Sequence, residues 1–381
     1  MSLRLPRHLP KTTEPRCPHF GRCGGCALQH VDYAEEVRIK QDALRELLNR
    51  DITVVPSPKP YNYRLKMTYV AAFGKLGFRK AGSRKQVVDL RECHLVRQRV
   101  SALLDDLHRW MLEFDIEGYD YLGHRGDLRY VVVRDAFSSN QLMVTLTTGS
   151  EQTRIGPLLD RLAERADSVV WMVNDTRTDV PEGRLQEVRG LDCIRQRVGH
   201  REFLLGPYSF FQNNLLLIDE MFAEIAGHVH GFAMDLYCGV GTIGLYCSDR
   251  ATRIFGVESV PQSIDLARRN ADLNKVTNAE FAAEDANDFL RVYTGPVPDT
   301  VIVDPPRTGL SPRLIRKLLR LGPGRIVYVS CNPKALAEDL TRLPNYQVTS
   351  LKAFDMYPQT PHIEVVAALD RVGYPPVHNE L

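Results

Sequence analysis

The chain has 381 residues, which is enough for two or three domains with substantial hydrophobic cores. Charged residues make up 25% of it and hydrophobic residues 44%, a balance typical of soluble globular proteins. The formal net charge is only +2, which neither requires nor excludes a nucleic-acid partner. No apolar run approaches the roughly 20 residues of a membrane span, and the N-terminus lacks a secretory signal. These features predict a cytoplasmic protein without a membrane partner.

The chain divides into three predicted parts. Residues 1–55 hold a basic, proline-containing arm over residues 1–16, expected to be poorly ordered, followed by a cysteine loop and a helix. Residues 56–205 carry mostly strand patterns and predict a central α+β domain. Over residues 206–381 strand and helix patterns alternate, which predicts a mostly parallel sheet with crossover helices. Strands are expected at 66–73, 76–78, 130–134, 142–147, 233–236, 253–257, 300–304, 325–329 and 365–369, and helices at 33–48, 100–111, 155–165, 261–274 and 312–321.

The cysteines cluster near the N-terminus. Cys17, Cys23 and Cys26 lie in one glycine-containing loop, and Cys93 follows at a distance in an Arg-Glu-Cys-His run. In a chain without an export signal, this clustering favours metal binding over disulfides. Three loop cysteines and one remote cysteine can ligate zinc or an iron–sulfur cluster, and the spacing alone does not choose between them.

A glycine-containing turn follows the first strand of the third part. Gly239 and Gly241 allow the backbone to approach a ligand closely, just before a predicted helix N-terminus. Glu258 ends the next strand 19 residues after Gly239, near the spacing of about 20 expected for a carboxylate that binds ribose hydroxyls. The alternative is a tight turn without a ligand. If a nucleoside binds, both a dinucleotide and S-adenosylmethionine fit the pattern.

Two further strand ends carry candidate reactive groups. Asp304 is followed by two prolines, which fix a rigid loop that can hold a base, although the same residues could simply end the strand. Cys331 follows a buried, β-branched strand that Pro333 prevents from continuing. In open α/β sheets, ligands bind at the carboxyl ends of the strands. Cys331 is therefore a candidate nucleophile rather than an inert core thiol.

Glu364 precedes an apolar strand near the C-terminus and is a candidate base. Alone, it would be interpreted as a solvated residue at a strand start, but this chain also offers a crevice cysteine and a nucleoside site. A nucleophile and a base together suit methylation at C5 of a pyrimidine, because C5 of uracil is a weak nucleophile. Addition of a thiolate at C6 makes C5 enolate-like, so that it attacks an activated methyl group, and a base then removes the C5 proton.

Five motifs in this order resemble those of the RNA (uracil-5-)-methyltransferase family. They are Phe-Phe-Gln-Asn-Asn at 210–214, Asp-Leu-Tyr-Cys-Gly at 235–239, Asp-Pro-Pro-Arg at 304–307, Ser-Cys-Asn-Pro at 330–333 and His-Ile-Glu at 362–364. The resemblance covers nearly the whole chain. It implies an α/β fold: a Rossmann-like S-adenosylmethionine-dependent methyltransferase domain, a central α+β domain that binds RNA, and an N-terminal iron–sulfur segment. It also implies Cys331 as nucleophile and Glu364 as proton acceptor.

The resemblance extends to the cofactors. It implies that S-adenosylmethionine is bound by Gln212, Tyr237, Glu258, Asp285 and Asp304. Thr242 departs from the family pattern, since many relatives carry asparagine there. The rRNA-modifying branch carries a [4Fe-4S] cluster on similar cysteine spacing, whereas the bacterial tRNA-modifying branch lacks these cysteines. A [4Fe-4S] cluster on Cys17, Cys23, Cys26 and Cys93 is therefore implied. The other thiols are expected to be core or loop residues: Cys193, Cys238 and Cys247.

Two basic loops are candidates for phosphate contact. One holds Arg79, Lys80, Arg84 and Lys85, and the other holds His124, Arg125 and Arg129. A solvated charged loop is the alternative, but an RNA substrate favours phosphate contact. The target uracil has to leave its stack to reach the cysteine, and Phe210 or Phe211 is a candidate stacking partner.

The identity of the target RNA rests on the N-terminus. Several relatives begin with a small β-barrel RNA-binding domain, and Cys17 comes too early in this chain to leave room for one. The chain is therefore most similar to the branch that modifies the uracil at position 747 of 23S rRNA, which is the expected RNA partner. Position 1939 of 23S rRNA and the tRNA T-loop uracil are alternatives within the family. A non-catalytic RNA-binding protein and a dinucleotide oxidoreductase are alternatives outside it, and no obligate protein partner is evident.

Overall fold

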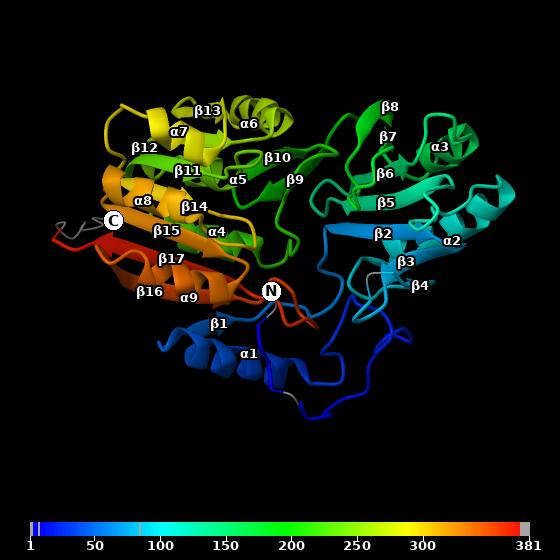
Figure 1. The fold of residues 1–381 in the computed structure, drawn as a ribbon, viewed down its shortest axis with the longest axis horizontal. Coiled ribbons are helices and arrows are strands. Elements are labelled where there is room, and N and C mark those ends of the chain that lie inside the picture. Colours follow the sequence, from blue (N-terminus) through cyan, green and yellow to red (C-terminus); the bar gives the residue numbers. More distant parts are fainter. Residues whose placement is uncertain (1–2, 7, 84, 374–381) are drawn as a thin grey trace.

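The computed structural model describes residues 3–6, 8–83 and 85–373. Figure 1 shows an α/β lobe on the left and the central lobe on the right, with the N-terminal segment in blue running beneath both. Among the described residues, no helix is long and apolar enough to cross a membrane.

The larger sheet forms the core of the α/β lobe. Its strands run in the order β1-β16-β17-β15-β14-β11-β12-β13, and neighbours are parallel except where β17 pairs antiparallel with β15 and β16. The alternation of strands and helices predicted this mostly parallel sheet. The strands are β1 (Thr53–Val55), β11 (Gly231–Leu236), β12 (Ala251–Glu258), β13 (Ala279–Ala283), β14 (Thr300–Val303), β15 (Arg325–Ser330), β16 (Tyr346–Phe354) and β17 (Glu364–Arg371).

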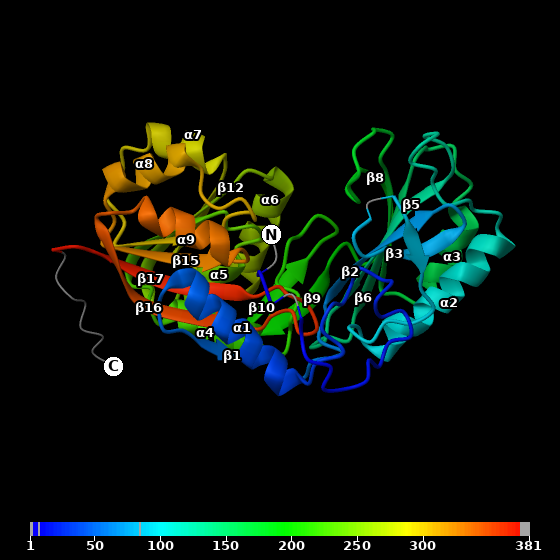
Figure 2. The ribbon, with the colours of Figure 1, turned by 60° about the horizontal axis from the view of Figure 1, so that its bottom comes forward.

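Helices cover both faces of this sheet (Figures 1 and 2). Their apolar positions recur at helical spacing, as in α8, where Leu314, Ile315 and Leu318 are buried. Strands β14 and β15 are almost entirely buried because helices exclude water from both of their faces. The helices are α1 (Tyr33–Leu48), α4 (Ile218–Ala226), α5 (Thr242–Cys247), α6 (Pro261–Leu273), α7 (Ala286–Val292), α8 (Pro312–Leu321) and α9 (Pro333–Thr341).

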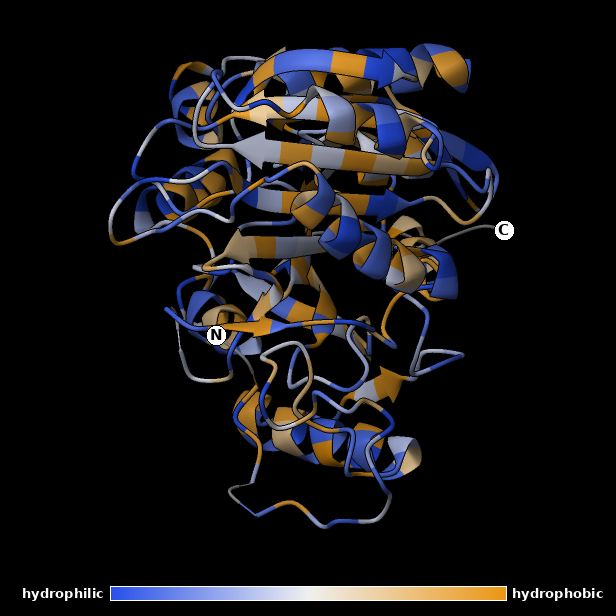
Figure 3. Ribbon diagram, turned by 90° about the vertical axis from the view of Figure 1, so that its right-hand side faces the viewer, coloured by the Kyte–Doolittle hydropathy of each residue, from blue (hydrophilic) through white to orange (hydrophobic). Residues whose placement is uncertain are grey.

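The central lobe is built on a mostly antiparallel sheet in the order β4-β3-β2-β5-β6-β7-β8. The amphipathic helices α2 and α3 pack on one face of it, and Figure 3, which views the molecule from this side, shows its helices banded in apolar orange and polar blue. The strands are β2 (Lys66–Ala72), β3 (Lys75–Arg79), β4 (Val87–Asp89), β5 (Leu128–Asp135), β6 (Leu142–Thr148), β7 (Ser168–Val173) and β8 (Arg184–Gly190), and the helices are α2 (Gln98–Glu113) and α3 (Gly156–Ala163).

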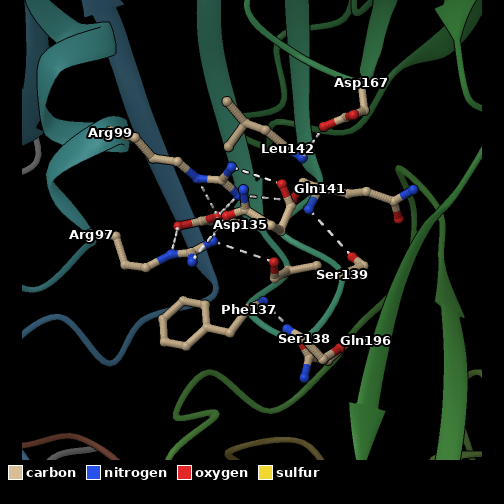
Figure 4. Close-up of polar contacts among 12 residues, drawn as sticks. Arg97, Arg99, Asp135, Phe137, Ser138, Ser139, Gln141, Leu142, Asp167 and Gln196 are labelled. Carbon is tan, nitrogen blue, oxygen red and sulfur yellow. Dashed lines mark hydrogen bonds and ion pairs between the residues drawn. The ribbon is translucent and has the colours of Figure 1, made fainter.

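A hairpin of β9 (Ile194–Val198) and β10 (Arg201–Leu205) joins the two lobes. It packs on α6, and its apolar side chains belong to a hydrophobic core cluster that both lobes share. The β5–β6 turn meets the hairpin through Gln196, whose Oε1 accepts a hydrogen bond from the Phe137 amide at 2.7 Å (Figure 4). Next to this turn, the buried Asp135 carboxylate binds the guanidinium groups of both Arg97 and Arg99.

The N-terminal residues pack more closely than the sequence predicted. Leu3 is buried in the α/β core and its amide donates to the carbonyl of Pro361 at 2.8 Å, so the expectation of a poorly ordered arm was wrong for the described residues of 1–16. Leu5 also packs against this core, but a Leu-Arg-Leu run is too short to predict such packing. The segment 33–55 also contributes α1 and the edge strand β1 to the α/β lobe, because β1 pairs with β16.

Candidate active site

A cleft of about 1210 Å³ lies where the three parts of the chain meet. The N-terminal loop lines it with residues 24–27, the central lobe with residues of β2 and β3, and the α/β lobe with the loops at its strand ends. Of the predicted catalytic and cofactor residues, it brings together Cys331, Glu364, Gln212, Tyr237, Glu258 and Asp304.

The register of the parallel strands brings three of these residues together. Leu236 of β11 pairs with Val257 of β12 and Val303 of β14, so Tyr237 follows between Glu258 and Asp304. Tyr237 has φ of +67°, a conformation that tyrosine rarely adopts and that marks a functional turn. The turn then continues through Gly239 and Gly241, both at positive φ, into α5.

The antiparallel pairing of β15 and β17 sets the positions of the predicted nucleophile and the predicted base. Ser330 pairs with Val365, so the next residues on the two strands, Cys331 and Glu364, lie opposite each other at the strand ends. The Asn332 side chain donates to the Arg307 carbonyl at 2.7 Å and ties the Cys331 loop to the loop that carries Asp304.

Burial and negative charge both act on the Cys331 thiol. Burial raises the pKa of this half-buried thiol to about 11, the carboxyls of Glu364 and Asp304 add to the shift, and Arg307 opposes it. Burial likewise raises the pKa of Glu364 well above its usual value, with Asp304 contributing and a hydrogen bond with Tyr357 opposing. A positive ligand in the cleft would lower the pKa of both groups.

Other buried carboxyls surround the glycine turn. Burial raises the pKa of Asp304 to about 7, against a hydrogen bond from Gln212 Nε2 at 3.4 Å. Burial also raises the pKa of Asp235 to about 8, although the Gly244 amide donates to its Oδ2 at 3.0 Å. Gln212 is buried, and its Oε1 has no hydrogen-bond partner in the part of the chain that the structure describes.

Asp285 and Glu258 differ in how available they are to a ligand. Asp285 is exposed, does not line the cleft, and caps α7 by accepting hydrogen bonds from the amides of Asn287 and Asp288. An aspartate that precedes a helix is a common N-cap, but no helix was predicted at 286–292, so the sequence did not indicate this role. Glu258 lines the cleft, and its Oε1 accepts hydrogen bonds from the Val260 amide and the Ser259 hydroxyl, both at 3.0 Å.

The four cysteines that were predicted to bind a cluster lie around a second, smaller cavity. Cys17, Cys23, Cys26 and Cys93 all line it, and Cys26 also lines the catalytic cleft. The thiols are close enough for their charges to raise one another's pKa values, as Cys17 does for Cys23. Within the described ranges, no group of three or more His, Cys, Asp or Glu residues is arranged to hold a metal ion. The remaining thiols outside the active site are buried, as expected: Cys193, Cys238 and Cys247.

Some of the residues predicted to contact RNA line the cleft, whereas others bind protein groups or lie away from the cleft. Lys80 lines the cleft beside Arg79, which binds Asp179. Arg129 is 1% exposed and donates to backbone carbonyls of the 174–178 loop, so its prediction as a phosphate contact was wrong. Its charge is satisfied by sequence-distant carbonyls, which no local pattern reveals. Arg84 lies outside the described residues. His124 and Arg125 lie in the second loop, which does not line the cleft.

The structure distinguishes the two phenylalanines of the 210–214 motif. Phe210 is 61% exposed and lines the cleft, whereas Phe211 is buried in the hydrophobic core. Sequence reasoning missed Arg64 and Tyr357, which also line the cleft. The Arg64 guanidinium lies 5.9 Å from the centre of the Tyr357 ring, in reach of a cation–π contact. Neither residue has a sequence signal of its own, because a tertiary contact brings the two together.

The fold and the cleft define an α/β methyltransferase of the S-adenosylmethionine-dependent class. The sequence profile of a family described as tRNA (Uracil-5-)-methyltransferase matches residues 196–372. The chain is 34% identical to the tRNA (uracil(54)-C(5))-methyltransferase of Pyrococcus furiosus, over 97% of this chain and 88% of the relative. An uncharacterized RNA methyltransferase of Caldanaerobacter subterraneus is 33% identical over 95% of this chain and 86% of the relative.

A solved structure is similar over most of the chain as well. The crystal structure of Pyrococcus abyssi tRNA (uracil-54, C5)-methyltransferase in complex with S-adenosyl-L-homocysteine matches with a TM-score of 0.79 and 34% identity, covering 91% of this chain and 85% of that chain. The chain thus belongs to the tRNA (uracil-5-)-methyltransferase family and is an RNA uracil-C5 methyltransferase.

The reactivity of Cys331 in the free protein should depend steeply on pH. With a pKa of about 11, roughly 10⁻⁴ of the thiol is thiolate at pH 7, so alkylation by iodoacetamide should accelerate about tenfold per pH unit up to pH 9. The Glu364→Gln variant should react faster than wild type, because it lacks a carboxyl that raises the thiol pKa. Peptide mass spectrometry measures the rate at Cys331. A rate independent of pH, or a slower variant, would contradict this electrostatic account.

Proposed function

We propose that the cleft methylates C5 of a flipped-out uridine, with Cys331 as nucleophile and Glu364 as proton acceptor. The observation that carries this proposal is the β15–β17 register, which sets the two side chains opposite each other. Both face the cleft that Phe210 borders. A thiol and a carboxyl at adjacent strand ends can act on C6 and C5 of the same ring, which are neighbouring atoms.

We also propose that S-adenosylmethionine binds at the carboxyl ends of β11, β12 and β14. The residues there fit it: Glu258 is a carboxylate at a strand end, suited to ribose hydroxyls, and the buried Gln212 Oε1 lacks a partner among the described residues. A Cβ added at Gly239 would meet no atom within 4 Å, so the turn leaves space for a ligand. When bound, the cofactor supplies a methyl group on a positively charged sulfur. Asp304, Tyr237 and Asp285 are further proposed contacts, Asp285 through its position beside Tyr237.

The chain's own residues then act in sequence. The Cys331 thiolate adds to C6 of uracil and leaves C5 enolate-like and able to accept the methyl group. The Glu364 carboxylate removes the C5 proton, and the C6–sulfur bond breaks to restore the ring and the free thiolate. A carboxyl whose pKa is raised by burial is a stronger proton acceptor once it is ionised, which suits Glu364 to this step. The exposed Phe210 ring offers a surface on which an unstacked base can pack.

For the RNA, we propose the uridine at position 54 of tRNA. The named relatives at 34–36% identity carry this target in their names, and they match 96–97% of this chain, which takes in the cysteine segment. The uridine at position 747 of 23S rRNA is the first alternative, and the uridine at position 1939 is the second. We propose that the central domain, residues 56–205, contacts this RNA through Lys80 and its neighbours.

For the cysteines, we propose a [4Fe-4S] cluster. Four thiols around one cavity are the donor set such a cluster uses, and the Gly25 amide lies 3.3 Å from Cys23 Sγ, as amides do around cluster sulfurs. A single zinc ion would need the four sulfurs within about 3.8 Å of one another, given zinc–sulfur bonds of about 2.3 Å. Zinc bound by the same four thiols is the alternative, and the metal content of the purified protein distinguishes the two. The cluster would brace the loop that lines the cleft.

The Glu364→Gln variant should trap the reaction after methyl transfer. Without a proton acceptor the C6–sulfur bond cannot break, so a covalent RNA–protein adduct should accumulate and turnover should fall at least about 10²-fold. The adduct is measured on denaturing gels with radiolabelled RNA. Adding Cys331→Ala should abolish it, and the exposed control Glu338→Gln should turn over like wild type. Normal turnover by Glu364→Gln would show that another group is the base.

The RNA target can be determined by testing methylation of each candidate RNA. Purified enzyme should methylate a tRNA transcript at position 54 and should lose this activity when that uridine is replaced by cytidine. Fragments of 23S rRNA containing positions 747 and 1939 should remain unmodified, as mapped by nucleoside mass spectrometry. Methylation of position 747 with none in tRNA would overturn the proposed target and favour the rRNA alternative.

Anaerobically reconstituted protein should bind iron and sulfide and show the broad visible absorption of an iron–sulfur cluster. Cys23→Ser should lose this absorption, because it removes one of the four proposed ligands. Cys193→Ser is the matched control, since Cys193 is a buried thiol outside the cysteine cavity and should not affect the spectrum. A colourless protein that binds one equivalent of zinc would refute the cluster.

A further inference from the structure

The segment between β16 and β17, residues 355–363, contains no helix or strand and lines the cleft next to Glu364. It supplies Tyr357 and His362 to the cleft lining and leads directly into Glu364. A hydrogen bond with Tyr357 also acts on the Glu364 carboxyl. The position of the base therefore depends on what holds this segment in place.

A buried ion network from α1 holds its first part. Lys40 Nζ lies 2.7 Å from Glu36 Oε1 and 2.8 Å from Asp355 Oδ1, and all three side chains are fully buried. Lys40 Nζ also donates to the Tyr357 carbonyl at 3.4 Å. A helical Glu and Lys four residues apart ordinarily form a solvated surface pair. Here tertiary packing buries them, so Asp355 is held by a charge that water does not screen.

The second part of the segment is held at Gln359. Its amide donates to Glu36 Oε1 at 2.8 Å, and its carbonyl accepts from the Ala27 amide at 2.9 Å and the Leu28 amide at 3.2 Å. Gln359 has φ of +69°, a left-handed conformation that a glutamine adopts only when its surroundings enforce it. Glu36 therefore links Lys40 to Gln359, and Gln359 links the network to the cysteine loop.

We propose that Lys40 is a positioning residue for the catalytic base. Through Asp355, Tyr357 and the Glu36–Gln359 link, it fixes the segment that places Glu364 opposite Cys331. The proposal rests on the proposed roles of Cys331 and Glu364. It predicts that loss of the Lys40 charge impairs removal of the C5 proton more than it impairs binding of RNA or cofactor, because Lys40, Glu36 and Asp355 do not line the cleft and Lys40 contacts Tyr357 through its backbone carbonyl.

The test compares Lys40→Met, Lys40→Arg and the exposed control Arg38→Met on the same helix. In Lys40→Met, kcat should fall about 10²-fold, since small misplacements of catalytic groups cost this much, while KM for RNA and the affinity for S-adenosylhomocysteine stay within about threefold. The RNA–protein adduct should accumulate as it does in Glu364→Gln. Lys40→Arg should recover part of kcat, and Arg38→Met should match wild type.

Lys40→Met leaves two buried carboxylates unpaired and can fail to fold. If Lys40→Met does not fold, the triple variant Glu36→Gln, Lys40→Met, Asp355→Asn replaces it in the test, because this compensated variant has no charge at the three network positions. Circular dichroism and urea unfolding check that it folds. A folded variant with wild-type kcat overturns the proposal. Failure of the compensated variant to fold also overturns it, because the network would then be needed for the stability of the whole domain. If wild type itself shows neither adduct nor methylation, the proposed function fails instead.

Discussion

The antiparallel pairing of β17 with β15 is the constraint on which the active site depends. The parallel strands β11, β12 and β14 all end at one edge of the sheet, where Tyr237, Glu258 and Asp304 lie. A further parallel strand would have ended there too, but β17 runs the other way and begins at this edge. The start of β17 thus lies beside the end of β15, and Glu364 lies opposite Cys331. A shift of β17 by one residue in this pairing would turn the Glu364 side chain to the other face of the sheet, away from Cys331.

The cleft concentrates carboxyl groups whose pKa values are raised by burial. Burial raises the pKa of Asp304 to about 7 and that of Asp235 to about 8, and it also raises the pKa of Glu364 well above its usual value. Ionising these carboxyls without a cation nearby is costly. A positively charged sulfur in the cleft would favour their ionised forms and the Cys331 thiolate together. In the proposed mechanism, cofactor binding would therefore favour the reactive forms of both Cys331 and Glu364.

Local patterns predicted much of this structure. The helix expected at 33–48 and the helix expected at 312–321 have the predicted bounds, and the strand ends that carry Asp304 and Cys331 meet in one cleft as expected. Non-local contacts could not be predicted in the same way. The three-residue strand β1 is defined by its pairing with β16, and Lys40 looks like a surface residue until Asp355, 315 residues away, is placed beside it. The burial of Arg129 depends likewise on a distant loop.

The central claim is that Cys331 bonds to C6 of the target uridine during methylation. RNA carrying 5-fluorouridine at the target position tests it most directly, because a base cannot remove fluorine from C5 and the intermediate is held. Incubation with enzyme and S-adenosylmethionine, followed by protease digestion and mass spectrometry, should find one modified peptide. The account predicts a methylated fluorouridine attached to Cys331. An adduct on another cysteine, or methylation with no adduct at all, would contradict it.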